Sequence, residues 1–90
     1  MWFVTLARMK EKISKETEDM ANKFLASPPP GVKIHHVLYT LGRFDLVIVY
    51  EAPTEKDAIV LGMFFGDKAF TETLVGVQRE EAKDLLKRLP

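Results

Sequence analysis

The chain has 90 residues, no cysteine, and 13 basic against 13 acidic side chains, so its formal net charge is zero. This length predicts a single domain, residues 1–90, with a core of limited size. The charge balance argues against nucleic-acid binding, which usually requires a basic patch. The absence of cysteine excludes disulfides, thiolate metal sites and a cysteine nucleophile.

No apolar run approaches the roughly 20 residues of a membrane span. The first ten residues, MWFVTLARMK, are apolar too briefly for a signal peptide and have no basic leader before them. We therefore expect a cytoplasmic protein with neither a membrane nor a nucleic-acid partner.

The first half of the chain predicts a strand, a helix and a second strand. Residues 2–9 alternate loosely between apolar and polar side chains, as a strand does. A helix is predicted over about residues 11–26, with Glu18 off its apolar stripe, and successive prolines after Ser27 end it. The stripe recurs at spacings of three and four and consists of Ile13, Thr17, Met20, Ala21 and Phe24.

Residues 38–53 (LYTLGRFDLVIVYEAP) predict a hairpin around which the other elements pack. Residues 37–41 and 44–50 are rich in β-branched and aromatic side chains. Between them, Gly42-Arg43 suits a two-residue type II′ turn, which requires a positive φ at Gly42. The turn sets a register with these opposite pairs: Tyr39 with Leu46, His36 with Val49, and His35 with Tyr50.

Apolar side chains occupy both faces of the second hairpin strand in this register. An antiparallel sheet with one solvated face would show a polar face instead. Since a chain this short has few elements to cover both faces, the sequence predicts a second subunit on the face that the helices leave open.

The second half of the chain predicts a helix, a strand and a final helix. Thr54 and Asp57 have the spacing of a capping box, which begins a helix that runs to about Gly66. Ala58, Leu61, Gly62 and Phe65 form its expected core-facing stripe. Val60 and Phe64 lie outside this stripe, and we expect the C-terminal helix or a neighbouring dimer to cover them.

A fourth strand is predicted over residues 70–78 and an amphipathic helix over residues 80–89. The complete order is βαββαβα. With antiparallel pairing it predicts an α+β fold in which helices cover one face of a four-stranded antiparallel sheet.

The run from Tyr39 to Asp45 (YTLGRFD), followed by Val47–Tyr50 and by Glu51-Ala52-Pro53, resembles the GYD domain family. The stretch Thr71-Glu72-Thr73-Leu74 and the order of elements fit this family as well, over nearly the full chain. The family's glycine, tyrosine and aspartate fall on Gly42, Phe44 and Asp45, so a phenylalanine replaces the tyrosine here.

The resemblance implies a ferredoxin-like βαββαβ fold of the dimeric α/β-barrel class, in which two sheets pack face to face. The extra C-terminal helix would follow this core. A weaker similarity extends to the effector-binding domains of feast/famine transcription regulators, which bind small molecules between subunits.

Polar residues on one face of the predicted hairpin are the candidate ligand-binding residues. Adjacent strand residues point to opposite faces, so His35 and His36 cannot bind one ion together, and we predict neither a metal nor a cofactor. For Asp45, hydrogen bonding to turn amides or to Thr40 is favoured over ligand contact. The predicted ligand-binding set is His36, Thr40, Asp45 and Glu51.

No catalytic signature stands out. We predict a small-molecule-binding or regulatory module that forms a homodimer or a higher homo-oligomer, with its ligand in the barrel or between subunits. One alternative is a cofactor-free dimeric-barrel enzyme, a monooxygenase or isomerase, with His36 as the base. The other is a structural oligomer without a ligand. A cavity of about 300 Å³ or more would favour a ligand.

Overall fold

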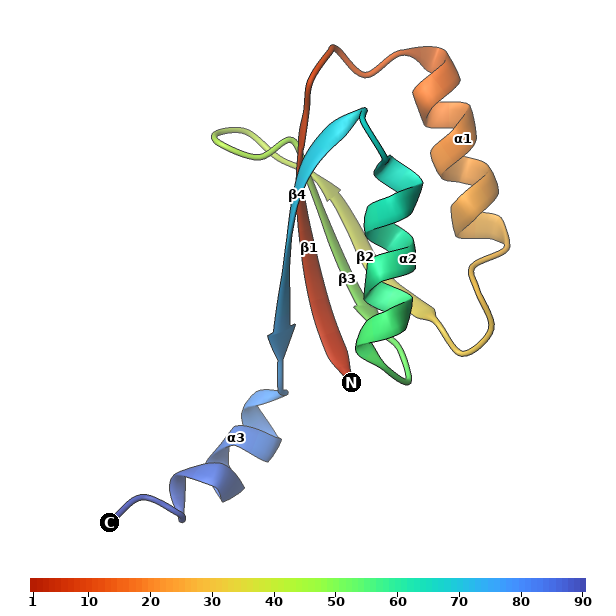
Figure 1. Ribbon diagram of the computed structural model, residues 1–90. Helices are drawn as coiled ribbons and strands as arrows, with labels where there is room; N and C mark the ends of the chain where they lie inside the picture. Colours follow the sequence, from red (N-terminus) through yellow and green to blue (C-terminus); the bar gives the residue numbers. More distant parts are fainter.

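The computed structural model describes residues 1–90 and contains one four-stranded antiparallel sheet and three helices (Figure 1). The elements follow in the order β1 (Trp2–Met9), α1 (Lys15–Ala26), β2 (Lys33–Tyr39), β3 (Leu46–Glu51), α2 (Glu55–Phe65), β4 (Ala69–Gly76) and α3 (Arg79–Leu86). The predicted α+β class and the βαββαβα order are confirmed, and the arrangement is compatible with the expected ferredoxin-like fold. None of the helices combines the length and the apolar character needed to cross a membrane.

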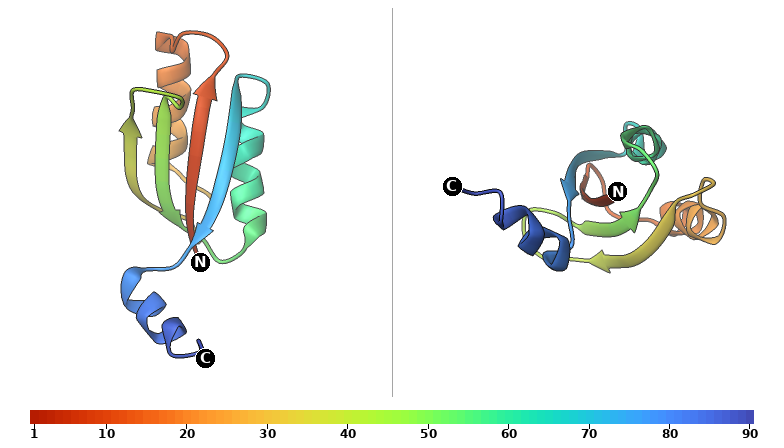
Figure 2. Two further views of the ribbon diagram at one scale, coloured as in Figure 1. Left: turned by 90° about the vertical axis from the view of Figure 1, so that its left-hand side faces the viewer. Right: turned by 90° about the horizontal axis from the view of Figure 1, so that it is seen from below.

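The strands lie in the order β2-β3-β1-β4, and every neighbouring pair is antiparallel. Helices α1 and α2 both lie on one face of the sheet, whereas no element of the chain covers the other face (Figure 2). Helix α3 projects from the end of β4, away from the other two helices (Figure 1). We call the uncovered side of the sheet the open face.

The core lies between the sheet and its two helices. Alternate residues of β1 and β3 are buried because side chains of a strand point to opposite faces in turn. From α2, the residues spaced three and four apart reach the same layer. The buried apolar residues are Phe3, Ala7, Leu46, Ile48, Tyr50, Ala52, Ala58, Leu61, Phe65 and Ala69.

Side-chain caps fix where the two packed helices begin. The Ser14 hydroxyl accepts a hydrogen bond from the Thr17 N–H (3.2 Å), so α1 begins at Lys15 rather than near residue 11. At α2, the Asp57 carboxylate accepts from the Thr54 N–H (3.2 Å), and the Thr54 hydroxyl caps the first turn. The predicted capping box is confirmed.

The hairpin connection is longer than predicted. Strand β2 ends at Tyr39 and β3 begins only at Leu46, so six residues rather than two join them. Asp45 is still bonded across the hairpin, since its carbonyl accepts from the Thr40 N–H (2.9 Å). In addition, its N–H donates to the Ala7 carbonyl (2.9 Å) and its carboxylate accepts from the Met9 N–H (2.8 Å). These bonds attach Asp45 to β1. Gly42 does have the predicted positive φ, at 107°.

The register of β2 and β3 is as predicted near the loop and shifts farther away. Tyr39 lies opposite Leu46 and His36 opposite Val49, but a β-bulge follows, and Ile34 rather than His35 lies opposite Tyr50. A bulge adds one residue to one strand and so exchanges the faces beyond it. The predicted pairing of His35 with Tyr50 is therefore wrong.

Helix α1 covers the part of α2 that we expected to need an external partner. The Phe64 ring packs against the Phe24 ring of α1, with 4.6 Å between ring centroids, and Phe64 is half-buried. The two helices lie side by side on the sheet, so Phe64 faces α1 (Figure 1), whereas Val60 remains 43% exposed. The expectation that α3 covers Val60 and Phe64 is wrong, and a dimer–dimer contact there stays a prediction.

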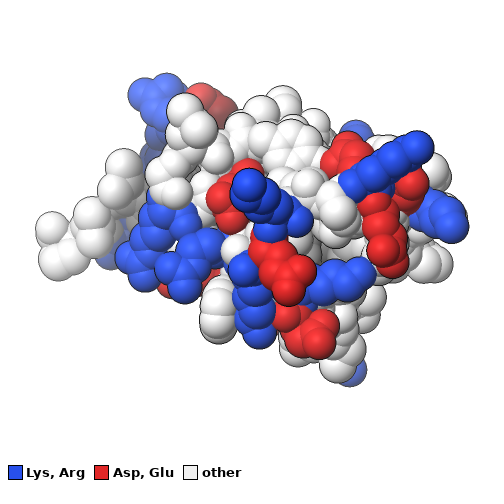
Figure 3. Space-filling model, turned by 90° about the horizontal axis from the view of Figure 1, so that it is seen from above, with Lys and Arg blue, Asp and Glu red and all other residues white.

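The open face is apolar along its centre. Val4, Leu6, Val47 and Val49 are half-buried side by side on β1 and β3. Leu38 on β2 and Leu74 on β4 flank them, with 53% and 51% of their surface exposed. By contrast, acidic and basic side chains are interspersed over the end of the molecule that carries the β1–α1 and α2–β4 connections (Figure 3).

Candidate ligand-binding site

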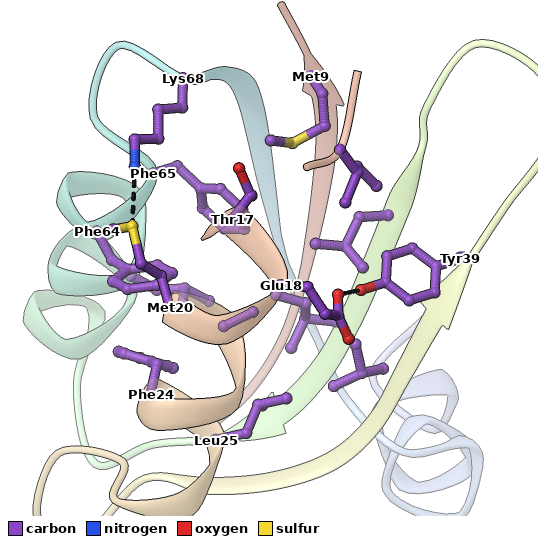
Figure 4. A pocket seen from close by; sticks show the side chains of 16 residues that line it. Met9, Thr17, Glu18, Met20, Phe24, Leu25, Tyr39, Phe64, Phe65 and Lys68 are labelled. Atoms are coloured by element: carbon purple, nitrogen blue, oxygen red, sulfur yellow. Dashed lines mark hydrogen bonds between the residues drawn. The ribbon is translucent and has the colours of Figure 1, made fainter. Parts of the chain in front are cut away.

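A cavity of about 260 Å³ lies between α1, the sheet and α2 (Figure 4). Thirteen of its sixteen lining residues are hydrophobic, so its interior offers few hydrogen-bonding groups. The sheet contributes Val37, Leu46 and Ile48, α2 contributes Leu61, Phe64 and Phe65, and α1 contributes Met20, Ala21, Phe24 and Leu25.

Loose packing of α1 explains why this space is not filled. No residue of α1 is fully buried, whereas Ala58, Leu61 and Phe65 of α2 are. The cavity side of α1 includes Ala21, whose single methyl group reaches only a short way toward the sheet. Well-packed interiors contain few voids larger than a water molecule. The cavity is smaller than the roughly 300 Å³ that we expected of a ligand pocket, so it is a candidate for a small bound molecule.

Two polar side chains meet at one side of the cavity. The Tyr39 hydroxyl, on β2, donates a hydrogen bond to the Glu18 carboxylate, on α1. This bond is the main cause that raises the pKa of Tyr39 above its ordinary value of 10.0, and burial and the negative charge of Glu18 act in the same direction. The bond ties α1 to the edge strand of the sheet.

A cation lies at the opposite side of the cavity. Lys68 belongs to the connection between α2 and β4, and its ammonium group lies 2.9 Å from the Met20 sulfur. Figure 4 shows Lys68 reaching toward Met20 on the α2 side, while the Tyr39–Glu18 pair lies on the β2 side. A thioether is only a weak acceptor, so this contact satisfies little of the hydrogen-bonding capacity of the ammonium.

The four residues predicted to bind ligand do not line this cavity. His36 is exposed on the open face of β2, and Glu51 lies at the far end of β3. Thr40 and Asp45 belong to the β2–β3 loop, where the Thr40 hydroxyl donates to the Phe44 carbonyl (2.6 Å). At about 3.3 Å per residue, Asp45 and Glu51 are roughly 20 Å apart along the strand, so one small molecule cannot contact all four residues.

The bulge creates a different polar contact on the open face. His35 Nε2 lies 3.1 Å from the Glu51 carboxylate, and the His35 ring stacks on Trp2 with 4.5 Å between centroids. Glu51 thus has as its partner His35, which is not one of the predicted ligand-binding residues. No group of three or more His, Asp or Glu side chains is placed to hold a metal ion.

A chain of hydroxyl groups crosses the covered face of the sheet beside the core. Thr5 is fully buried, and its hydroxyl lies 3.0 Å from both the Tyr50 and the Thr73 hydroxyls. Burial raises the pKa of Tyr50 above 10.0, while its hydrogen bonds to Thr5 and Thr73 act in the opposite direction. Every buried polar side-chain atom has a partner, so this chain stabilises the fold and has no free group for chemistry.

Sequence reasoning missed Tyr39, Glu18 and Lys68 as cavity residues. Glu18 was placed off the apolar stripe of its helix, yet it is half-buried and accepts a hydrogen bond from the Tyr39 hydroxyl. Lys68 follows a helix in a short connection, where a lysine is ordinarily solvated. No local signal marks these residues, because they come from three elements that only the tertiary fold brings together.

No protein-family model matches this chain, and no curated protein and no solved structure shows significant similarity to it. The resemblance to the GYD family stays a prediction from the sequence.

Proposed function

We propose that this protein is a small-molecule-binding module that holds an apolar ligand in the cavity between α1, α2 and the sheet. The observation that carries the proposal is the cavity itself, about 260 Å³ with a mostly hydrophobic lining. An apolar cavity of about 150 Å³ accepts a benzene molecule. The larger cavity here has room for an apolar body of about eight to twelve non-hydrogen atoms.

We propose further that the module acts as a homodimer in which the open faces of two copies pack together. Val4, Leu6, Val47 and Val49 give this face an apolar centre, and no element of the chain covers it. At the rim, Lys33 lies opposite Glu51, so both signs of charge are present. A two-fold axis can therefore juxtapose unlike charges, and the expected dimeric barrel has the same face-to-face contact.

The ligand-binding proposal is tested by filling the cavity. Isothermal titration calorimetry with 1-octanol as the probe measures binding to the natural protein and to Ala21→Phe, which places a ring inside the cavity. Ala26→Phe is the matched control, since Ala26 is exposed at the end of the same helix. We expect octanol to bind the natural protein and the control, and not Ala21→Phe.

Two results contradict this proposal. The first is that the natural protein does not bind octanol. The second is that Ala21→Phe, shown by circular dichroism to be folded, binds octanol as tightly as the control. The second result would place the octanol outside this cavity.

A further inference from the structure

The Lys68 ammonium is the only cationic group among the residues that line the cavity. Lys68 is exposed, and only its backbone is held in place, because the Lys68 N–H donates to the Phe65 carbonyl and the Lys68 carbonyl accepts from the Lys10 N–H, both at 3.0 Å. The two lysine–carboxylate ion pairs of the protein and the His35–Glu51 contact involve other residues, so no carboxylate lies within 4.0 Å of this ammonium. The side chain instead crosses the cavity rim to the Met20 sulfur.

The remaining polar groups of the lining already have partners. Glu18 accepts from the Tyr39 hydroxyl, and the Thr17 hydroxyl is hydrogen-bonded to Ser14 (3.1 Å). The two sides of the cavity thus differ in charge, with a paired carboxylate near β2 and an unpaired ammonium near α2 (Figure 4). A negatively charged head group is repelled from the Glu18 side and attracted to the Lys68 side.

From this asymmetry we infer that the ligand is a medium-chain monocarboxylate, with its apolar chain inside the cavity and its carboxylate paired with Lys68. The inference rests on the proposed function and adds the chemical class and the orientation of the ligand. The size of the cavity suits a chain of about eight carbons. In binding, the carboxylate replaces the weak thioether contact of Lys68 with a charge-assisted hydrogen bond.

The test compares three eight-carbon probes, octanoate, 1-octanol and octylammonium, by isothermal titration calorimetry at pH 7.5. We expect octanoate to bind about fivefold more tightly than octanol, because a solvent-accessible ion pair contributes up to about 1 kcal/mol. Octylammonium should bind most weakly. The preference for octanoate should shrink as salt is raised from 50 to 500 mM, since salt screens an accessible pair.

The matched variants are Lys68→Met and Lys23→Met. The first removes the ammonium and keeps an unbranched apolar side chain. Octanoate should then bind no more tightly than octanol, while the affinity for octanol is retained. The second removes a lysine that is exposed on α1 and does not line the cavity. It should bind all three probes as the natural protein does.

The outcomes separate this inference from the proposed function. If none of the three probes binds, the proposed function is wrong and the inference falls with it. If octanoate and octanol bind equally, or if Lys68→Met keeps the preference for octanoate, the cavity binds ligands but the assignment of Lys68 is wrong. If octylammonium binds most tightly and Glu18→Gln abolishes its advantage, the head-group site is Glu18 and the inference is overturned.

Discussion

Asp45 offers a direct test of whether a residue predicted to contact ligand is instead structural. Its carboxylate accepts a hydrogen bond from the Met9 N–H (2.8 Å) at the end of β1, and Asp45 is half-buried. Asp45→Ala removes this charged acceptor and leaves the Met9 N–H without its partner. A hydrogen bond to a charged group contributes about 1.5–3 kcal/mol, and the partial exposure places the expected loss near 2 kcal/mol.

This loss of stability should lower the urea concentration at the midpoint of unfolding. The unfolding is monitored by the fluorescence of Trp2, the only tryptophan. For a domain of this size, about 2 kcal/mol corresponds to a fall of roughly 8–16 °C in the melting temperature. Asp45→Asn keeps an acceptor but not its charge and should lose about half as much. Asp67→Ala, which removes an exposed carboxylate with no hydrogen-bond partner, serves as the control.

The same variants distinguish the structural from the ligand-binding role. Asp45 does not line the cavity, so folded Asp45→Ala should bind octanol with the affinity of the natural protein. An unchanged unfolding midpoint would refute the assigned role of the Met9 contact. Unchanged stability together with lost octanol binding would show that Asp45 contacts the ligand.

Three further predictions concern the loop, the buried hydroxyls and the assembly. Gly42→Val should lower the free energy of unfolding by more than about 1 kcal/mol, because a β-branched residue is strained at the φ of 107°. The control is Gly76→Val, at a glycine that has no positive φ and also has open space around it. Equal melting curves of the two variants would contradict the prediction. Burial raises the pKa of Tyr50, so its contribution to stability is complete below pH 10 and decreases as the pH rises from 10 through the raised pKa of the folded state. Tyr50→Phe should therefore lose less stability than the natural protein as the pH rises from 9 to 11, measured by urea unfolding. An identical pH dependence of stability in both proteins would show that other groups cause the loss. In sedimentation equilibrium at micromolar concentration, the protein should have twice the 10.3 kDa mass of one chain. Val49→Glu on the open face should reduce it to a monomer, whereas Ile59→Glu on the exposed side of α2 should not. A natural protein that sediments as a monomer would exclude the proposed dimer.

Local patterns in the sequence were sufficient for the elements and much of their packing. Hydrophobic periodicity gave the βαββαβα order and the core-facing stripe of α2, where Ala58, Leu61 and Phe65 are indeed buried. The capping box at Thr54 and the positive φ at Gly42 were also predictable. These features depend on residues a few positions apart, whose side-chain spacing and backbone preferences act within one element.

Features that depend on distant residues were decided by the tertiary structure. Asp45, next to the loop after β2, is bonded to Met9 of β1, which lies 36 residues earlier in the chain. The bulge that moves His35 to the side of Glu51 is an irregularity of strand pairing, and no turn rule predicts it. Phe64 is covered because α1 lies beside α2 on the same face of the sheet.

The cavity shows this division most clearly. The sequence determined that α1 has an apolar stripe and that β2 and β3 have apolar faces. It did not determine how closely the helix approaches the sheet, because that distance depends on how side chains of three elements fill the space between them. Only the tertiary structure places Tyr39 and Glu18 on one side of an apolar cavity and the unpaired ammonium of Lys68 on the other, and the proposed ligand follows from that placement.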